Sequence, residues 1–252
     1  MRKVSRDKRL STAHLIGHRG VAGLAPENTL AGFHRAGALG LGMVEFDVML
    51  TRDNQPVVIH DETLERTTNG QGRVAEIYWA ALEGLDAGSW FAPEFAGEGV
   101  PSLMQVAIVL SRLTVNANIE IKPSEGRDAD TGLGVAAAVQ RCWPHVLEAP
   151  LFSSFSFEAL TAAQAVTPNG RFALLYGRLP AEWRGQAEEI GAEAIHLNAD
   201  GLDEAEVAAV KAAGLDLRVY TVNDREEAQR MIALGVDQVF TDHPERLLGD
   251  IQ

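Results

Sequence analysis

The chain has 252 residues, of which 46% are hydrophobic and 23% are charged, and its formal net charge is −13 at pH 7. So acidic a chain is a poor ligand for DNA, RNA or an anionic membrane, because binding to a polyanion depends on neutralising its phosphates. No apolar run approaches the ~20 residues that span a bilayer, and the single cysteine, Cys142, excludes an intramolecular disulfide.

The N-terminus differs from the rest of the chain because it is basic. Residues 2–9 carry five basic side chains and one acidic side chain, Asp7. The apolar run of a secretory signal does not follow them. We therefore expect residues 1–12 to form a solvated basic arm, and we expect a cytoplasmic protein without stable membrane association.

Short β-type runs alternate with alanine-rich helical patterns along the whole chain. Strands are predicted near residues 14–18, 43–49, 115–121, 150–154, 171–176, 193–197, 215–221 and 236–241. Helices are predicted near residues 28–39, 103–112, 130–142, 156–166, 181–190, 203–213, 224–233 and 243–249. Eight alternations favour a closed parallel barrel over an open doubly wound sheet. The predicted fold is therefore α/β, a (β/α)8 TIM barrel formed by residues 1–252 as a single domain.

One segment interrupts this alternation after the second strand. Additional apolar runs lie between residues 56 and 101, ahead of the next predicted helix. We expect a small insertion over about 61–101, which would project from the C-terminal rim, where barrel enzymes build their sites.

Acidic side chains occupy one face of the second predicted strand. Because side chains alternate between faces, Val44, Phe46 and Val48 point one way, and Glu45 and Asp47 point the other. The apolar set suits packing against the outer helices, which places both carboxylates inside the barrel.

The third predicted strand repeats this pattern, with Asn118, Glu120 and Lys122 facing inward. Crowded carboxylates raise one another's pKa, and a divalent cation with oxygen ligands removes that conflict. We therefore predict that Glu45, Asp47 and Glu120 bind Mg²⁺ or Ca²⁺, with Mn²⁺ as a further option. The alternative is an internal ion-pair network of these carboxylates with Lys122 and Arg19.

Two histidines are expected at the same rim. His18 ends the first strand, and His60 follows the apolar run 57–59 and precedes Asp61. Histidine is suited to moving protons near neutral pH, and Asp61 or a backbone carbonyl could orient the His60 ring. Arg19 and Lys122 would complement the oxygens of a phosphate group.

Collinear segments of the chain resemble the glycerophosphodiester phosphodiesterase family, and the resemblance covers nearly the whole sequence. The segments are HRGVAGLAPENTLAGF (18–33), VEFDVMLTRDNQPVVIHDETLERTTNGQG (44–72), LDAGSWFAPEFAGEGVPSL (85–103), IEIKP (119–123), VYTVN (219–223) and TDHP (241–244).

The resemblance implies a (β/α)8 barrel with an insertion after the second strand. It also implies metal binding by Glu45, Asp47 and Glu120, acid–base roles for His18 and His60, and phosphate binding by Arg19 and Lys122. Tyr220 stands where the family often has tryptophan, in the position that closes over the substrate, so we expect Tyr220 to contact substrate and to influence head-group preference.

The expected reaction is metal-dependent hydrolysis of soluble glycerophosphodiesters to glycerol 3-phosphate and an alcohol. The partner would be this small-molecule substrate, with no nucleic acid. Two alternatives stay open: a phospholipase that acts on membrane lipids, and a catalytically silent barrel that binds phosphate. The sequence leaves undecided the preferred alcohol, the metal, the oligomeric state, the role of the insertion, and whether water or a glycerol hydroxyl attacks.

Other polar and aromatic residues have structural interpretations. We expect Asn28 and Thr29 to cap the first helix, with Glu27 near its N-terminal end. Trp90 and Phe91 suit either an apolar rim or a satellite core. Cys142 is expected to be a buried small residue. His196 ends the sixth strand and could reach the rim, but a structural role is favoured. No carboxylate partner is predicted for four histidines: His14, His34, His145 and His243.

Overall fold

The computed structural model describes residues 10–249, so residues 1–9 of the predicted basic arm lie outside the described residues. Within the described range, eight strands run parallel to one another. They are β1 (Leu15–Gly17), β2 (Met43–Leu50), β4 (Asn116–Ile121), β5 (Leu151–Ser154), β6 (Arg171–Tyr176), β7 (Ala194–Asn198), β8 (Asp216–Tyr220) and β9 (Gln238–Thr241).

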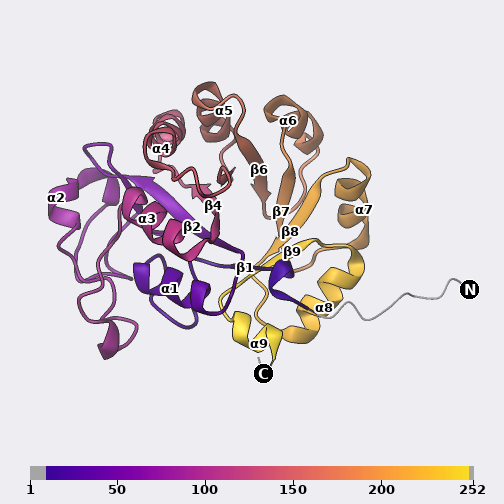
Figure 1. Ribbon diagram of the computed structural model, residues 1–252. Coiled ribbons are helices and arrows are strands. Elements are labelled where there is room, and N and C mark those ends of the chain that lie inside the picture. The colour runs from indigo at the N-terminus through magenta and orange to yellow at the C-terminus, as the bar shows by residue number, and fades with distance from the viewer. Residues whose placement is uncertain (1–9, 250–252) are drawn as a thin grey trace, which may run out of the picture.

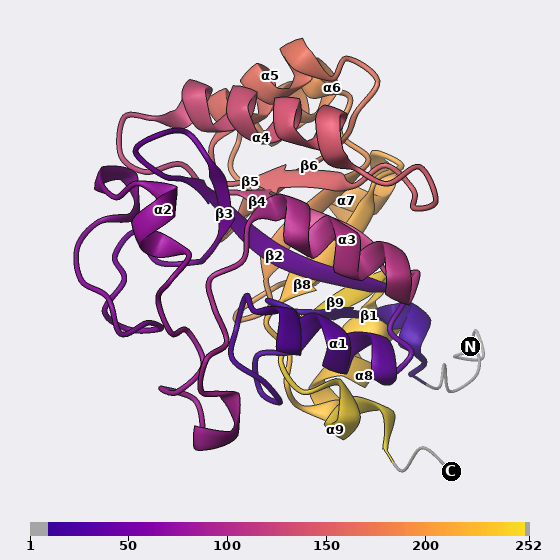
Figure 2. The same cartoon turned by 60° about the vertical axis from the view of Figure 1, so that its left-hand side comes forward.

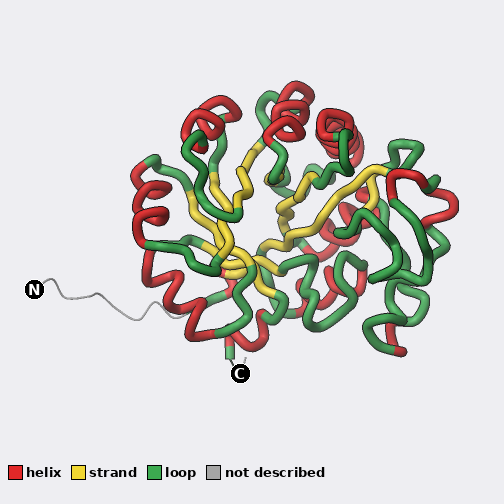
Figure 3. The backbone as a smooth tube through the Cα atoms, turned by 180° about the vertical axis from the view of Figure 1, so that it is seen from behind, coloured by secondary structure: helices red, strands yellow, loops and turns green. Residues whose placement is uncertain are grey.

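The parallel strands close into a barrel. Their order is β1-β9-β8-β7-β6-β5-β4-β2, and β1 pairs with β2 through Gly17 and Val44, which joins the two ends of the sheet. Helices surround the strands in the ribbon view (Figure 1), and the view from behind shows the strands enclosed by the helices (Figure 3). The predicted (β/α)8 TIM barrel is confirmed.

The helices follow the predicted alternation. They are α1 (Leu30–Ala38), α2 (Trp79–Leu82), α3 (Leu103–Leu113), α4 (Asp128–Cys142), α5 (Phe157–Val166), α6 (Trp183–Ile190), α7 (Glu204–Ala212), α8 (Arg225–Leu234) and α9 (Pro244–Leu248). Apart from α2, which lies in the insertion, each helix and each parallel strand begins and ends within two residues of its predicted position.

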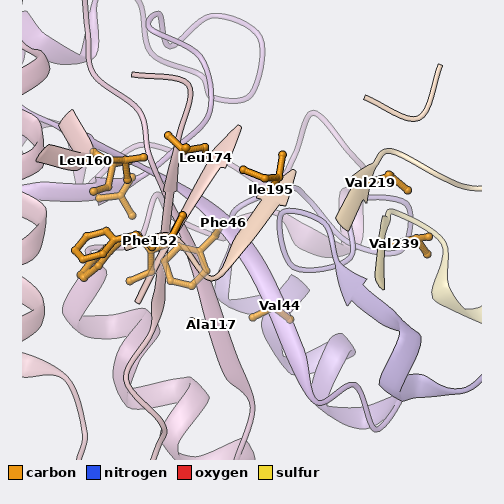
Figure 4. Packing of buried hydrophobic residues seen from close by; sticks show 14 of the residues in the cluster. Val44, Phe46, Ala117, Phe152, Leu160, Leu174, Ile195, Val219 and Val239 are labelled. Atoms are coloured by element: carbon orange, nitrogen blue, oxygen red, sulfur yellow. The ribbon is translucent and has the colours of Figure 1, made fainter. Parts of the chain in front are cut away.

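The main core lies between the strands and the helices. Val44, Phe46 and Val48 are fully buried on the outer face of β2, and the Phe46 ring meets Phe33 of α1 edge to face at 5.4 Å. The same outward apolar face continues around the barrel through Leu174 and other labelled residues (Figure 4). The faces predicted for β2 are therefore correct, and Glu45 and Asp47 point into the barrel.

The additional apolar runs between residues 56 and 101 begin with a strand. Residues 56–58 form a short strand, β3 (Pro56–Val58), which pairs antiparallel with the end of β2. The segment that follows contains α2 and two 3₁₀ turns, Val74–Glu76 and Pro93–Phe95, and it projects from one side of the barrel (Figure 2). Its small core, which includes Met49, is separate from the main one.

The aromatic residues of the insertion pack among themselves. Trp90 meets Phe91 edge to face at 5.7 Å, and Phe91 meets Phe95 at 5.5 Å. Neither Trp90 nor Phe91 belongs to the small core of the insertion, and 41% of Trp90 is exposed, so the satellite core does not account for them. Across residues 10–249, the structure contains no helix both long enough and apolar enough to cross a membrane. The cytoplasmic location stays a prediction.

Candidate active site

A cavity of about 190 Å³ opens where the parallel strands end. Seven of the eight residues predicted for the site line it, and the eighth, Asp47, is buried with 1% of its surface exposed. The lining residues are His18, Arg19, Glu45, His60, Asn118, Glu120, Lys122, Phe155, Leu175, His196, Tyr220, Thr221 and Phe240.

Three carboxylates converge beside this cavity. Glu45, Asp47 and Glu120 each place one carboxylate oxygen within 4.8 Å of the others. The parallel register of β2 and β4 pairs Asp47 with Glu120, which explains how residues distant in sequence meet. The predicted convergence of acidic side chains from adjacent strands is therefore observed.

Asp47 is the carboxylate with cationic and amide partners. One of its oxygens lies 3.6 Å from Lys122 Nζ, and the other lies 3.6 Å from Arg19 Nε and accepts a hydrogen bond of 2.9 Å from Asn28 Nδ2. Burial opposes ionisation of this group, but the charges of Lys122 and Arg19 outweigh it and hold the pKa of Asp47 below its usual value. For Asp47, the contacts with Lys122 and Arg19 match the ion-pair network that the sequence offered as the alternative to a metal site.

Glu45 and Glu120 are in the opposite situation. Burial, reinforced by the charges of Asp47 and Glu120, raises the pKa of Glu45 well above its usual value. Burial and then the charge of Asp47 raise the pKa of Glu120 to about 8. Two carboxylates that resist ionisation beside a third that is ionised fit a hard divalent cation, because such a cation takes oxygen ligands and offsets their repulsion.

His18 is held by a carboxylate that the sequence interpretation did not include. Its Nδ1 lies 2.7 Å from Asp242 Oδ1, and its Nε2 lies 4.0 Å from Glu45 Oε2. Asp242 also accepts a 2.8 Å hydrogen bond from Asn223 Nδ2. Gly17 allows the turn after β1, since a Cβ there would lie 2.1 Å from the carbonyl oxygen of Gly20. The 4.0 Å distance from His18 Nε2 to Glu45 Oε2 means that this nitrogen faces the carboxylate cluster.

His60 is held in the same way by its neighbour. Its Nδ1 lies 2.6 Å from Asp61 Oδ1, which agrees with the orientation considered from the sequence. Arg66 in the insertion donates to Asp61 and, at 2.8 Å, to Glu27, which also accepts from Arg19 Nη1 at 2.8 Å. A chain of ion pairs thus connects the insertion to the barrel. It also holds the pKa of Asp61 below its usual value, chiefly through the Arg66 hydrogen bond.

Tyr220 lies at the mouth of the cavity, next to Phe155. Their rings meet edge to face at 6.1 Å, and 56% of Phe155 is exposed. The Tyr220 hydroxyl donates a 2.9 Å hydrogen bond to the backbone carbonyl of Tyr176. The ring is therefore fixed by its hydroxyl and presents an aromatic surface to the cavity.

Three expectations for single residues need correction. Asn28 does not cap α1, whose N-cap is Thr29 without a side-chain cap bond; Asn28 instead holds Asp47. His243 has a carboxylate neighbour, Glu245, at 3.1 Å. Cys142 is half-buried instead of buried. His196 is fully buried, as a structural residue would be, yet it lines the cavity.

Motifs within the sequence could have signalled two of the missed residues. Asp242 belongs to the TDHP segment that contributes to the family resemblance, and Asn28 belongs to its PENT segment. Arg66 also belongs to such a segment (44–72), but the sequence does not show its contacts with Glu27 and Asp61, which form only after the insertion folds back.

A larger cavity, about 410 Å³, lies at the opposite end of the barrel beside the starts of β5 and β6. Trp143, Leu147 and Phe152 contribute to its mostly apolar lining, and none of the carboxylates described above belongs to it. The chemistry-bearing side chains therefore gather in the smaller cavity.

Comparison with known proteins decides the family. The profile of the Glycerophosphoryl diester phosphodiesterase family matches residues 18–246. The chain belongs to this family. A glycerophosphodiester phosphodiesterase of Caldanaerobacter subterraneus is 36% identical over 235 residues, which cover 93% of this chain and 96% of that protein. A putative glycerophosphodiester phosphodiesterase of Bacillus subtilis, YhdW, is 32% identical over 94% of this chain and 97% of its own.

Solved structures of the glycerophosphoryl diester phosphodiesterase family share the fold. An Oleispira antarctica phosphodiesterase, solved with its product sn-glycerol-3-phosphate, is 37% identical with a TM-score of 0.89, covering 93% of this chain and 94% of that one. A putative family member from Silicibacter pomeroyi is 26% identical with a TM-score of 0.81, covering 93% and 91%. The predicted family and enzyme class are therefore confirmed.

Proposed function

We propose that this enzyme hydrolyses small glycerophosphodiesters to glycerol 3-phosphate and an alcohol. The observation that carries the proposal is the pair of histidines, each with its Nδ1 on a carboxylate, at a cavity that also contains the acidic cluster. Similarity to the Oleispira antarctica phosphodiesterase with bound sn-glycerol-3-phosphate supports the choice of substrate class.

Glu45, Asp47 and Glu120 would hold a divalent cation, for which Mg²⁺, Ca²⁺ and Mn²⁺ are the candidates. When bound, such an ion polarises a phosphate oxygen and lowers the pKa of a bound hydroxyl. The support for this assignment is the donor set itself, three carboxylates of which two resist ionisation on their own.

Arg19 and Lys122 would bind the non-bridging oxygens of the phosphate. Both line the cavity, and both already lie 3.6 Å from Asp47, so their charges are fixed at the level of the acidic cluster. A guanidinium forms two parallel hydrogen bonds to such a group, whereas an ammonium acts as a compact charge. Together they would orient the phosphorus for attack.

His18 and His60 would transfer the protons. In each, the carboxylate on Nδ1 fixes the ring and leaves Nε2 free to accept or donate a proton. One histidine would take the proton of the attacking hydroxyl, and the other would protonate the departing alkoxide. Burial holds the pKa of His60 below its usual value, although the nearby charge of Asp47 opposes this effect. The lowered pKa favours the neutral form of His60 at pH 7.

The test is to assay release of glycerol 3-phosphate from glycerophosphocholine and glycerophosphoethanolamine with Mg²⁺, Ca²⁺ or Mn²⁺, and again after treatment with EDTA. We expect turnover with at least one cation and its loss in EDTA. Vesicles of phospholipid assayed in parallel separate this activity from that of a phospholipase. Release of lipid products from vesicles alone would contradict the proposal, and no turnover in any arm would instead support a silent phosphate-binding barrel.

A further inference from the structure

The floor of the cavity contains buried polar atoms that the proposed chemistry does not use. His196 and Asn118 both line the cavity, and 0% and 1% of their surfaces are exposed. Within residues 10–249, neither ring nitrogen of His196 has a hydrogen-bond partner, and the amide oxygen of Asn118 has none. Buried polar groups are nearly always paired, so these atoms are available to a ligand or an ordered water in the cavity.

Asn118 lies beside one member of the acidic cluster, because the register of β2 and β4 pairs it with Glu45. Asn118 is the inward-facing residue that precedes Glu120 on β4, about 7 Å further down the strand at the usual rise of a β-strand. His196 precedes Asn198, which the register of β7 and β8 pairs with Tyr220. Barrel interiors are built from layers of inward side chains, and these two buried residues form the floor of the cavity.

The unpaired atoms match the hydrogen-bonding pattern of an alcohol. Asn118 Nδ2 donates to Ser153 Oγ at 2.9 Å, which fixes the amide and leaves its oxygen as an acceptor. Burial, and then the charge of Arg218, hold the pKa of His196 well below its usual value, so its ring is neutral with one N–H donor. A hydroxyl group can donate to the amide oxygen of Asn118 and accept from the His196 N–H, and it therefore pairs one atom of each residue.

We propose that Asn118 and His196 bind the terminal hydroxyl of the glycerol half of the substrate. This inference rests on the proposed function. With the phosphate held between Arg19 and Lys122, the end of glycerol farthest from the phosphate reaches the floor of the cavity. The other alcohol then leaves past Phe155 at the open mouth. The floor would select for glycerol, and the mouth would tolerate different leaving alcohols.

The test compares two substrates that differ by one hydroxyl. Glycerophosphocholine is assayed beside the 2-hydroxypropyl phosphodiester of choline, which lacks the terminal hydroxyl and keeps the neighbouring one, so that attack by water or by that hydroxyl stays available in both. We expect the wild-type enzyme to favour glycerophosphocholine in kcat/KM by about 10- to 100-fold, because the analogue leaves buried partners unpaired.

The variants are His196→Phe, which keeps the ring contact with Phe240 at 5.0 Å, and Asn118→Leu, which keeps the side-chain size. Each is expected to reduce the preference to within about threefold, whereas His196→Gln, which can hydrogen-bond, retains part of it. His34→Phe is the matched control, since it makes the same exchange on an exposed position of α1 and should keep the full preference.

A wild-type enzyme without the preference, or variants that retain it, would overturn the proposal. If the variants fail to fold, calorimetry measures the affinity of the wild-type enzyme for glycerol 3-phosphate and for 2-hydroxypropyl phosphate. Equal affinities would contradict the proposed hydroxyl site. If the enzyme hydrolyses neither substrate, the proposed function fails, while the same pair of affinities still decides the hydroxyl site.

Discussion

Replacing Asp242 with asparagine tests how His18 is positioned. Asp242 offers Oδ1 to His18 Nδ1 at 2.7 Å and Oδ2 to Asn223 Nδ2 at 2.8 Å. Asparagine has a single carbonyl oxygen, so one of these two donors must face an amide NH₂ group in the variant. Where that donor is His18, the imidazole is driven to the other tautomer, and its Nε2 can no longer accept a proton.

The magnitude follows from the lost hydrogen bond. A hydrogen bond to a charged group contributes about 1.5–3 kcal/mol, and each 1.36 kcal/mol of transition-state stabilisation is tenfold in rate. Because His18 and Asp242 are both mostly buried, with 18% and 24% of their side chains exposed, solvent replaces little of this loss. We therefore expect Asp242→Asn to lower kcat/KM by about 10- to 150-fold.

The assay is release of glycerol 3-phosphate at saturating divalent cation, with the thermal unfolding midpoint and the metal affinity measured beside it. Metal affinity should be nearly unchanged, because Asp242 lies outside the carboxylate cluster. Asp130→Asn, on an exposed position of α4, is the matched control and should behave as wild type. Activity of Asp242→Asn within about twofold of wild type would refute the positioning of His18 by this carboxylate.

Three further predictions concern the cluster and the histidines. Glu45→Gln and Glu120→Gln should each weaken Ca²⁺ or Mg²⁺ binding about tenfold or more, since each removes a charged oxygen ligand; calorimetry that showed unchanged affinity would remove that residue from the ligand set. His18→Ala and His60→Ala should each lower kcat at least about 100-fold. A p-nitrophenol leaving group, which departs without a proton, should restore only the variant that lacks the acid, and equal restoration of both would contradict a division of roles. In EDTA, stability should fall as the pH rises from about 4.5 to about 8, because folded Glu120 retains a proton that the unfolded chain has lost. Added Ca²⁺ should therefore raise the unfolding midpoint more at pH 8 than at pH 5, and the opposite order would disprove this explanation.

The alternation of side chains along strands explains why much of the site was predictable. In β2, apolar Val44, Phe46 and Val48 alternate with Glu45 and Asp47, and packing of the apolar set against helices leaves the carboxylates only the barrel interior. The alternation of apolar and polar residues is a local property of the sequence, so element positions were predicted closely. β3 was missed because its three residues pair with β2 as an edge strand, and so short a run resembles a loop.

The residues that sequence reasoning missed act through contacts between distant segments. Asn28 adopts a left-handed backbone conformation, with a φ of 58°, and its amide reaches Asp47 instead of the helix N-terminus. The capping prediction was reasonable because asparagine before a helix satisfies free N–H groups. It was wrong because a buried carboxylate offers a charge-assisted hydrogen bond, which is stronger than a neutral cap. A choice of that kind depends on tertiary structure.

The three carboxylates differ in how far nearby positive charges offset their negative charge, and this difference indicates where the chemistry lies. Arg19 and Lys122 both approach Asp47, so this carboxylate is ionised and fixed before any cation binds. Glu45 and Glu120 lack comparable compensation, and their raised pKa values mean that folding leaves a free-energy cost at those two positions. A fold selected only for stability would relieve this cost with an apolar or amide side chain. The presence of this free-energy cost beside two oriented imidazoles is explained if a bound cation offsets it. Glu45 and Glu120 then bind that cation more tightly than carboxylates already neutralised by protein side chains would.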